Sequence, residues 1–400
     1  MRVLFVSQEM PPETGWGGIG TYVDVLSEAL AADGVEVHVL SVVEGQEPSV
    51  KRTGGVTIHR RALPPVRGAW RLPPESWRRT WLAVTVARLI GSLDIRPEVV
   101  ECPEWMAEGL ALALRGRVPL VVRLHSSARQ LFPHTGQGGR AGGLDGRLAA
   151  WLEELSARRA NVVISTRSNL DEVAGQFGLG DRALHAIPYP VRLPNPAPMP
   201  ENGAPRVTFV GRLEPRKAPE VVLRAAPKVL AAVPEARFAF VGRDATADGA
   251  PPSTAWLRAE AERLGVSDAI ELTGQLDRDG VEAQLQRATV CAFPSRWESF
   301  GNVVAEASAV GRPVVASAIP PFRELVEDGV SGRIAPLDDP AAWADALIDV
   351  LGDRRLAAEM GRAGAQRIAG ISDPAHVAQL TLAAHEHAIE RWRRGERAAS

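Results

Sequence analysis

A proline-dense segment (residues 187–205, IPYPVRLPNPAPMPENGAP) divides this chain of 400 residues into two parts. Proline lacks a backbone N–H and fixes φ at about −65°, so the segment cannot form a helix or a central strand. On each side of it, short apolar strands alternate with helical stretches, a pattern typical of α/β sheets. Because 45% of the residues are apolar, large cores can be filled. We therefore predict α/β domains at residues 1–187 and 206–373, with a linker at 188–205.

Two glutamates, Glu298 and Glu306, are the most informative residues of the second domain. Residues 289–293 (TVCAF) are typical of a buried strand, 294–301 of a turn and 302–310 of a short helix, and another strand follows. This βαβ pattern puts the turn at the carboxyl end of a strand, where open α/β sheets bind ligands. Carboxylates accept hydrogen bonds from hydroxyls, and the free N–H groups that start a helix favour an anion. The turn is therefore predicted to bind sugar or ribose hydroxyls and a phosphate.

A second candidate loop follows the predicted strand at residues 206–210 (RVTFV). It reads Gly-Arg-Leu-Glu-Pro-Arg-Lys and carries Arg212 and Lys217. A guanidinium and an ammonium in one short loop can converge on two phosphates. Only three lysines stand among the 46 lysine and arginine residues, so a lysine here indicates that a compact point charge is needed. The alternative is an ordinary surface loop with routine charges.

Together these two segments resemble the signatures of glycosyltransferase family 4, whose members are retaining enzymes that use nucleotide sugars. Glu298 and Glu306, with Phe-Gly between them, resemble the Glu-x7-Glu motif, and Arg212 and Lys217 resemble the Gly-Arg-Leu-x3-Lys segment. The resemblance implies the GT-B fold, in which two Rossmann-like βαβ domains face each other across a cleft. It further implies that the last helix, residues 374–394, packs back on the first domain.

The resemblance also implies a role for each residue. Glu306 would hold the ribose hydroxyls and Glu298 the sugar hydroxyls. Arg212 and Lys217 would stabilise the departing diphosphate, so neither a metal nor a cofactor is expected. The backbone N–H groups that would help to bind the donor are those of Phe300, Gly301, Asn302 and Val303.

Two segments depart from the family pattern. Ala218 follows Lys217 where the family usually has glycine, which puts the backbone path of that loop in question. Residues 188–192 (PYPVR) replace the usual Pro-Asn-Gly-Val-Asp at the start of the linker, a change that bears on hinge or acceptor contacts.

The amino terminus carries a Gly-x-Gly-x-x-Gly pattern at residues 15–20, with Glu44 near the end of the next strand. A dinucleotide site would read this way, but its glycines should follow the first strand directly. Here residues 8–14 intervene, so NAD binding is the less favoured reading. We expect instead that Gly17 and Gly18 begin the first helix and, as the resemblance implies, approach the donor diphosphate.

The first domain offers further candidates at strand ends. His125 ends the strand at 119–124 and resembles the family's histidine near the donor sugar; we favour a polar contact there over a general base. The alternative is a histidine that caps loop carbonyls. Glu104, Trp105 and Arg129 are the candidate acceptor residues, with Glu104 alternatively belonging to the cap of the next helix.

Two longer segments could carry acceptor specificity. Residues 126–146 are glycine-rich and would either order over the acceptor or form a surface insertion. Residues 64–89 interleave arginine and tryptophan, and Trp77 and Trp81 share a helix face. Packing of that helix on the sheet is favoured. Peripheral docking on a membrane, with a lipid-linked acceptor, and stacking on a soluble sugar are the alternatives.

Composition excludes several other classes. A net charge of −2 gives no nucleic-acid footprint. Cys102 and Cys291 lie far apart in sequence and do not suggest a disulfide framework. Residues 1–7 read as a core strand rather than a signal peptide, and no apolar run reaches membrane-spanning length. We therefore expect a cytoplasmic protein.

The function predicted is metal-independent, retaining transfer of a hexose from a nucleotide sugar to a hydroxyl acceptor. A UDP-sugar is the favoured donor because it is the commonest in the resembling family, and GDP-mannose is the runner-up. A sugar-nucleotide epimerase, an NAD-dependent oxidoreductase and a non-catalytic sugar-nucleotide sensor stay as alternatives. The sequence predicts neither the acceptor nor the oligomeric state.

Overall fold

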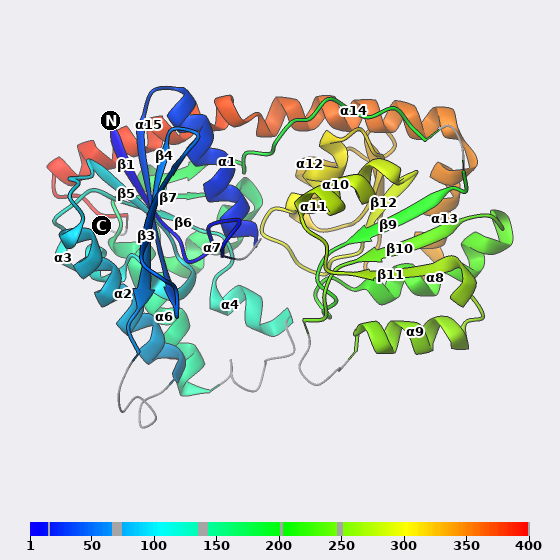
Figure 1. Cartoon of the computed structure of the whole chain (residues 1–400), viewed down its shortest axis with the longest axis horizontal. Helices are drawn as coiled ribbons and strands as arrows, with labels where there is room; N and C mark the ends of the chain where they lie inside the picture. The colour runs from blue at the N-terminus through cyan, green and yellow to red at the C-terminus, as the bar shows by residue number, and fades with distance from the viewer. Residues whose placement is uncertain (15–16, 66–73, 135–142, 201–202, 246–250, 399–400) are drawn as a thin grey trace. The chain divides into compact units, whose positions relative to one another are not determined.

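The computed structural model describes residues 1–14, 17–65, 74–134, 143–200, 203–245 and 251–398 (Figure 1). The chain forms two compact units. Unit 1 comprises Met1–Pro133, Gln137–Pro190 and Pro374–Ser400, and unit 2 comprises His134–Gly136 and Val191–Asp373. Each unit is a Rossmann-like sheet with helices, so the predicted α/β fold class is confirmed.

Unit 1 is built on an eight-stranded sheet in the order β3-β4-β2-β1-β5-β6-β7-β8. The strands are β1 (Arg2–Val6), β2 (Glu36–Glu44), β3 (Ser49–Thr53), β4 (Val56–Leu63), β5 (Val99–Pro103), β6 (Leu120–Arg123), β7 (Val162–Ser165) and β8 (Leu184–Ala186). Neighbouring strands are parallel except in the β3–β4 hairpin. The central strands are buried apolar runs, as expected of parallel strands that helices cover on both faces.

Unit 2 is a six-stranded, all-parallel sheet in the order β11-β10-β9-β12-β13-β14. The strands are β9 (Arg206–Val210), β10 (Arg237–Val241), β11 (Ile270–Gly274), β12 (Val290–Phe293), β13 (Val314–Ser317) and β14 (Gly332–Ala335). Strands β9 and β12 begin within one residue of the strands predicted at 206–210 and 289–293. The strand order reverses between β9 and β12, and the loops that leave these two strands border the crevice where such sheets bind ligands.

Helices cover both sheets. Those of unit 1 are α1 (Gly18–Ala32), α2 (Pro74–Ser92), α3 (Leu110–Arg115), α4 (Ala128–Leu131), α6 (Leu144–Arg159), α7 (Arg167–Phe177) and α15 (Pro374–Arg393). Those of unit 2 are α8 (Pro219–Ala232), α9 (Thr254–Arg263), α10 (Arg278–Arg287), α11 (Asn302–Ala309), α12 (Pro320–Leu325), α13 (Pro340–Gly352) and α14 (Arg354–Ser372). The 3-10 helices are η2 (Trp105–Ala107), η3 (Phe132–His134), η4 (Asp181–Ala183) and η6 (Ser267–Ala269).

Helix α15, drawn in red in Figure 1, belongs to unit 1 although it follows unit 2 in the chain. It packs against α1 and the strands β5, β6 and β7. His385 is fully buried there and hydrogen-bonds Glu101 through Nε2 at 2.7 Å. Arg391 donates from Nε to the carbonyl of Asn161 at 3.0 Å. Buried polar contacts of this kind fix the helix in one register on the sheet.

The start of the linker is anchored in unit 1. Arg123 is fully buried and donates to the carbonyls of Ile187, at 2.8 Å, and Pro188, at 3.2 Å. Its guanidinium lies over the ring of Tyr189, 4.9 Å from the ring centre. Tyr189, one of the residues that depart from the family pattern, therefore belongs to a buried cluster of unit 1.

Candidate active site

Two loops of unit 2 meet at the carboxyl edge of its sheet. One leaves β9 and runs to Ala218, and the other leaves β12 and runs to Gly301. Because β9 and β12 are neighbours, their loops lie side by side, and the N–H of Arg296 donates to the carbonyl of Arg216 at 2.8 Å. The predicted residues Lys217 and Glu298 are thereby brought together.

Glu298 lies between two cations. Lys217 donates from Nζ to its Oε1 at 2.5 Å, and Arg216 donates from Nη1 to its Oε2 at 2.8 Å. Only 10% of the Glu298 side chain and 13% of the Lys217 side chain are exposed. Arg216 also donates to Glu214, with Nη2 to Oε1 at 2.7 Å, and Arg212 approaches the same oxygen at 3.2 Å. We call these five residues the Glu298 cluster.

Electrostatics in the Glu298 cluster favour charged side chains. Burial alone would raise the pKa of Glu298, but Arg216 and Lys217 lower it to about 2. Burial lowers the pKa of Lys217, and the carboxylate of Glu298 opposes that change. The pKa of Arg216 is raised by Glu298 and Glu214 in spite of burial. The carboxylates thus hold a guanidinium and an ammonium in their cationic forms inside a largely desolvated site.

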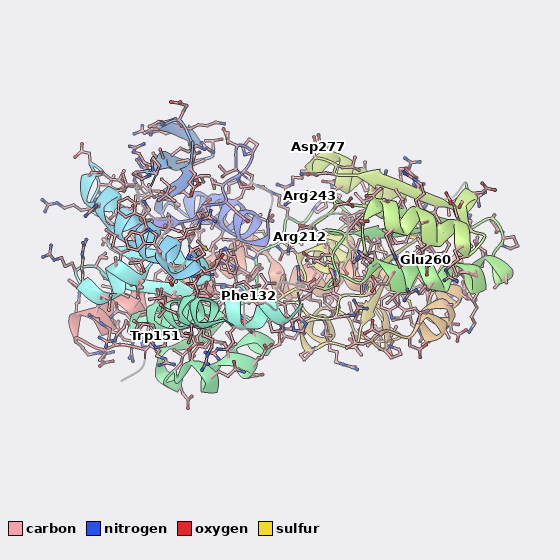
Figure 2. The ribbon with its side chains drawn as sticks, turned by 90° about the horizontal axis from the view of Figure 1, so that it is seen from below. Phe132, Trp151, Arg212, Arg243, Glu260 and Asp277 are labelled. Carbon is pink, nitrogen blue, oxygen red and sulfur yellow. The ribbon has the colours of Figure 1, made fainter. Side chains whose placement is uncertain are left out.

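Arg216 was absent from the predicted site. Its signal was the Arg-Lys pair that ends the loop, but the spacing could not tell which of two arginines would reach Glu298. The predicted Arg212 instead has a 46% exposed side chain. Figure 2 shows it in a row with Arg243 and Asp277, which follow the adjacent strands β10 and β11 on the same edge of unit 2.

Helix α11 begins at this edge with Gly301 as its N-cap. Gly301 has φ +107°, and a Cβ there would lie 2.5 Å from the Phe322 ring. Only glycine therefore fits, and the first N–H groups of the helix, including those of Asn302 and Val303, start at this turn. Phe300 is buried beside it.

Glu306 lies on α11, half-buried. Burial raises its pKa to about 7, against the opposing effect of Arg278 and Lys217. Within the described residues, its carboxylate makes no hydrogen bond or ion pair. A carboxylate in this state can bind hydroxyls either as an acceptor or, when protonated, as a donor.

Ala218 takes the backbone conformation that a glycine would take. Its φ is +50° and its ψ +43°, and it is the N-cap of α8, with Pro219 at the first helical position. A left-handed alanine costs about 1–2 kcal/mol. The left-handed conformation that glycine adopts most easily is therefore present at this position, at some cost in strain.

The chain also contains one Asp-x-Asp sequence, Asp277-Arg278-Asp279. Asp277 is the N-cap of α10 and accepts a hydrogen bond from the N–H of Gly280 at 2.9 Å. Within the ranges that the structure describes, no three histidine, cysteine, aspartate or glutamate side chains are grouped so as to hold a metal ion.

His125 is buried in unit 1. Its Nδ1 is hydrogen-bonded to the hydroxyl of Tyr189, and Tyr22 packs edge-on against its ring at 5.2 Å. Burial and the Arg123 guanidinium hold the pKa of His125 well below its usual range. The imidazole is therefore neutral at neutral pH. A low pKa agrees with a polar contact better than with a general base, which has to accept and hold a proton.

Two of the predicted acceptor residues are engaged elsewhere. Glu104 is fully buried, and both its oxygens accept from the N–H of His125 at 2.8 Å. Burial raises its pKa to about 8. Arg129 pairs with Glu154 at 2.5 Å. Glu104 thus holds the backbone N–H of His125, and an acceptor role for it stays a prediction. Trp105 is half-buried, and its ring contacts the guanidinium of Arg79 at 5.6 Å.

The turn before α1 holds a carboxylate. Gly17 is the N-cap of the helix, and a Cβ on it would lie 2.1 Å from Oε2 of Glu9. The same oxygen accepts from the N–H of Gly20 at 3.1 Å. The helix N-terminus expected to face a phosphate at Gly17 and Gly18 is therefore occupied by Glu9. Residues 15 and 16 of the glycine pattern lie outside the described residues.

The arginine–tryptophan segment is described at residues 64–65 and 74–89, and its residues 66–73 lie outside the described part. Trp77 and Trp81 stack at 6.3 Å on α2. Arg79 is fully buried and donates to Glu153 at 2.9 Å. Leu82 is buried in the core of unit 1, as in a helix packed on the sheet. Of the loop at 126–146, residues 135–142 are likewise not described.

Two further findings bear on the expected class. In the described ranges, each helix is either too short or too polar to cross a lipid bilayer. Cys102 and Cys291 are buried free thiols, and burial raises the pKa of the Cys291 thiol to about 12.

Comparison with known proteins adds evidence from outside the chain. Residues 17–190 match the glycosyl transferase 4-like domain, and residues 196–367 match the glycosyl transferases group 1. The chain is 31% identical over 421 residues to glycogen synthase of Mycobacterium tuberculosis, which covers 99% of this chain and 96% of the relative. It is also 31% identical over 396 residues to a D-inositol 3-phosphate glycosyltransferase of Xylanimonas cellulosilytica, with 91% of each covered.

Solved structures agree in fold. Sucrose-phosphate synthase from Thermosynechococcus elongatus superposes with a TM-score of 0.75 at 21% identity, over 96% of this chain and 98% of the other. The Anabaena protein HepE in complex with UDP-glucose gives 0.71 at 18% identity, over 96% and 99%. These likenesses confirm the predicted GT-B fold.

Proposed function

Because this chain belongs to the glycosyl transferases of group 1, enzymes that transfer sugar from a nucleotide sugar, we propose that it is a retaining, metal-independent hexosyltransferase that uses a UDP-sugar. The acceptor in this proposal is a hydroxyl of a sugar, a glycan or a small metabolite. Support for UDP comes from HepE, whose structure with UDP-glucose has the same fold. The relatives are named for acceptors as different as glycogen and an inositol phosphate, so the acceptor has to be argued separately.

The observation that carries the proposal is the Glu298 cluster at the strand-order reversal of unit 2. Three cations, Arg212, Arg216 and Lys217, stand against two carboxylates, Glu214 and Glu298, which leaves one net positive charge. The N-terminus of α11 adds partial positive charge at the same edge. A diphosphate is an anion that such a site can hold without a metal ion.

In this proposal, Lys217 and Arg212 bind and stabilise the departing diphosphate. Charge accumulates on the leaving phosphate as the bond from the anomeric carbon to its oxygen breaks, so fixed cations lower the barrier most when they are already in place. Glu298 keeps Lys217 protonated and oriented before the donor arrives. Arg216, which is largely buried, pairs with the other carboxylate oxygen of Glu298.

The remaining contacts complete the donor site. Glu306 is assigned to the ribose hydroxyls because its carboxylate is unpaired in the described residues and half-buried. The N–H groups of Phe300 to Val303 are assigned to the phosphate or the sugar. In the transfer itself, the acceptor hydroxyl would attack the anomeric carbon from the face that the diphosphate leaves, and its proton would pass to the departing phosphate oxygen.

A thermal-shift panel of UDP, GDP, ADP, TDP, their sugar conjugates and NAD tests the donor class. A ligand at a hundred times its Kd should add about 2.7 kcal/mol to the free energy of unfolding. UDP and a UDP-sugar should stand out, and Lys217→Ala should lose that stabilisation. A response to GDP instead would move the proposal to GDP-mannose, and a response to NAD alone would refute it. Turnover of donor alone to an isomer would indicate an epimerase.

A further inference from the structure

Unit 1 contains a cavity of about 250 Å³ that none of the donor assignments uses. It lies where the loops leaving β1 and β5 diverge, the point at which the strand order of this sheet reverses. Such points are where open α/β sheets bind ligands. Its volume is below the range of about 300–1,000 Å³ for drug-sized sites, so it fits one small ring better than a chain.

The walls of the cavity carry a carboxylate with one oxygen that lacks a hydrogen-bond partner within the described residues. Glu108 is 2% exposed, and its Oε1 accepts a hydrogen bond from Nε2 of Gln8 at 3.0 Å. Its Oε2 is buried and makes no hydrogen bond within the described residues. A buried polar atom without a partner is costly, and a ligand hydroxyl would satisfy it.

The other walls are also suited to a sugar. Glu9 adds a second carboxylate to the lining of the cavity, and Trp105 adds a half-buried indole ring. The hydroxyls of Ser7 and Thr14 already donate to the carbonyls of Glu9 and Met10. An aromatic ring beside acceptor oxygens matches a molecule with C–H faces and many hydroxyls.

The turn that presents Trp105 and Glu108 is held under strain. Met106 and Ala107 between them have φ values of +60° and +52°, which non-glycine residues rarely adopt. The N–H of Met106 donates to Oε1 of Glu153 at 3.1 Å, and Glu153 is itself paired with buried Arg79. A rigid, buried ion pair thus fixes the turn, as befits a site whose side chains must be pre-positioned.

From these contacts we infer that the cavity is the acceptor subsite and that the acceptor group it takes is an uncharged, hydroxyl-rich ring, a sugar or a cyclitol without phosphate. No lysine or arginine is among the residues that line it, whereas two carboxylates are. A phosphate there would face the charge of Glu9 and, above about pH 7, that of Glu108 as well, with no lysine or arginine among the lining residues. The role of acceptor rests on the proposed function, but the binding of a small ring in this cavity can be measured independently of it.

Direct binding to the full chain provides the first test. Saturation-transfer NMR titrations with UDP present would compare myo-inositol, glucose and maltose with D-inositol 3-phosphate and glucose 6-phosphate. We expect at least one neutral compound to bind, and each phosphorylated compound to bind at least about tenfold more weakly than its neutral counterpart. Equal or tighter binding of the phosphorylated partners, or no binding by any neutral compound, would overturn the inference.

Variants locate the binding and separate charge from shape. Trp105→Ala should weaken the neutral compounds about tenfold, and the matched control Trp151→Ala, a tryptophan on the exposed face of α6, should not (Figure 2). The double variant Glu9→Gln, Glu108→Gln keeps the shapes and removes both charges, so the neutral-to-phosphorylated ratio should fall about tenfold. An unchanged ratio, with circular dichroism as for the parent chain, would refute the charge argument.

A parallel UDP titration of the same samples keeps the two proposals apart. UDP should bind the parent chain and the cavity variants alike, because the donor contacts assigned above lie in unit 2. Ring binding without UDP binding would refute the proposed donor and leave the cavity assignment standing. UDP binding without ring binding would refute the cavity assignment alone.

Discussion

Removing the charge of Glu298 is the sharpest test of how the site is held together. In Glu298→Gln the amide keeps the shape of the side chain, but Lys217 and Arg216 lose their shared counter-ion. The pKa of Glu298 is lowered from 4.5 to about 2, which corresponds to about 3 kcal/mol of stabilisation of the charged form. Breaking a buried pair by removing one partner typically costs about 3–5 kcal/mol. We therefore expect a loss of about 3 kcal/mol at pH 7.

A matched control is available in the same unit. Glu260 also has its pKa lowered to about 2, by Arg263 and Arg224, but those two side chains are 65% and 45% exposed. Ion pairs with solvated partners contribute about 0–1 kcal/mol. Glu260→Gln, at the position labelled in Figure 2, should therefore change stability by less than about 1 kcal/mol.

Urea titrations followed by tryptophan fluorescence, repeated from pH 7 to pH 3, would measure both variants. Because folding lowers the pKa of Glu298, its contribution is complete above pH 4.5 and is lost as pH falls from 4.5 toward 2. The difference between the parent chain and Glu298→Gln should shrink over that window. Equal losses in Glu298→Gln and Glu260→Gln, or a difference that does not depend on pH, would refute the electrostatic account.

Three further outcomes can be checked. Lys217→Ala should raise the free energy of the transition state by about 2–4 kcal/mol, which a UDP-release assay would show as a lower kcat/KM; an unchanged kcat/KM would remove Lys217 from the mechanism. Gly301→Ala should destabilise unit 2 by about 2–4 kcal/mol in the same urea titration, because φ is +107° and the new Cβ would clash with Phe322; near-parent stability would contradict the geometry. The pKa of Glu306 is raised to about 7, so its share of stability falls as pH rises from 4.5 to 7; Glu306→Gln should flatten the dependence of Tm on pH in that window, and an unaltered slope would count against it.

Much of the fold could be predicted from local sequence patterns. The strands β9 and β12 could be predicted because each is a short apolar run beside turn residues, and such runs depend little on distant sequence. The loop after β9 and the turn after β12 could be singled out for the same reason. Their meeting follows from the parallel topology, which fixes the edge of the sheet but not the side-chain contacts.

The pairing of side chains could not be predicted in this way. The resemblance to the Gly-Arg-Leu-x3-Lys segment pointed to Arg212, yet Arg216 is the arginine that donates to Glu298, with the buried Glu214 accepting from the same guanidinium. Glu104 was read as an acceptor-binding acid or as part of a helix cap, and the fold buries it against the N–H of His125. Glu9 carries no motif at all and still caps α1. Each of these contacts depends on segments brought together only by the tertiary fold.

The place of α15 has a consequence for how the protein is made. Unit 1 draws its last helix from the end of the chain, so a ribosome has to finish unit 2 before His385 and Arg391, the partners of Glu101 and Asn161 on α15, exist. Ala398 closes the same surface, with its N–H on the carbonyl of Ala160 and its carbonyl on the N–H of Gly180. A premature stop codon near residue 374 would therefore remove part of unit 1, although unit 1 begins the chain. Unit 2, which ends at Asp373, would be left nearly whole.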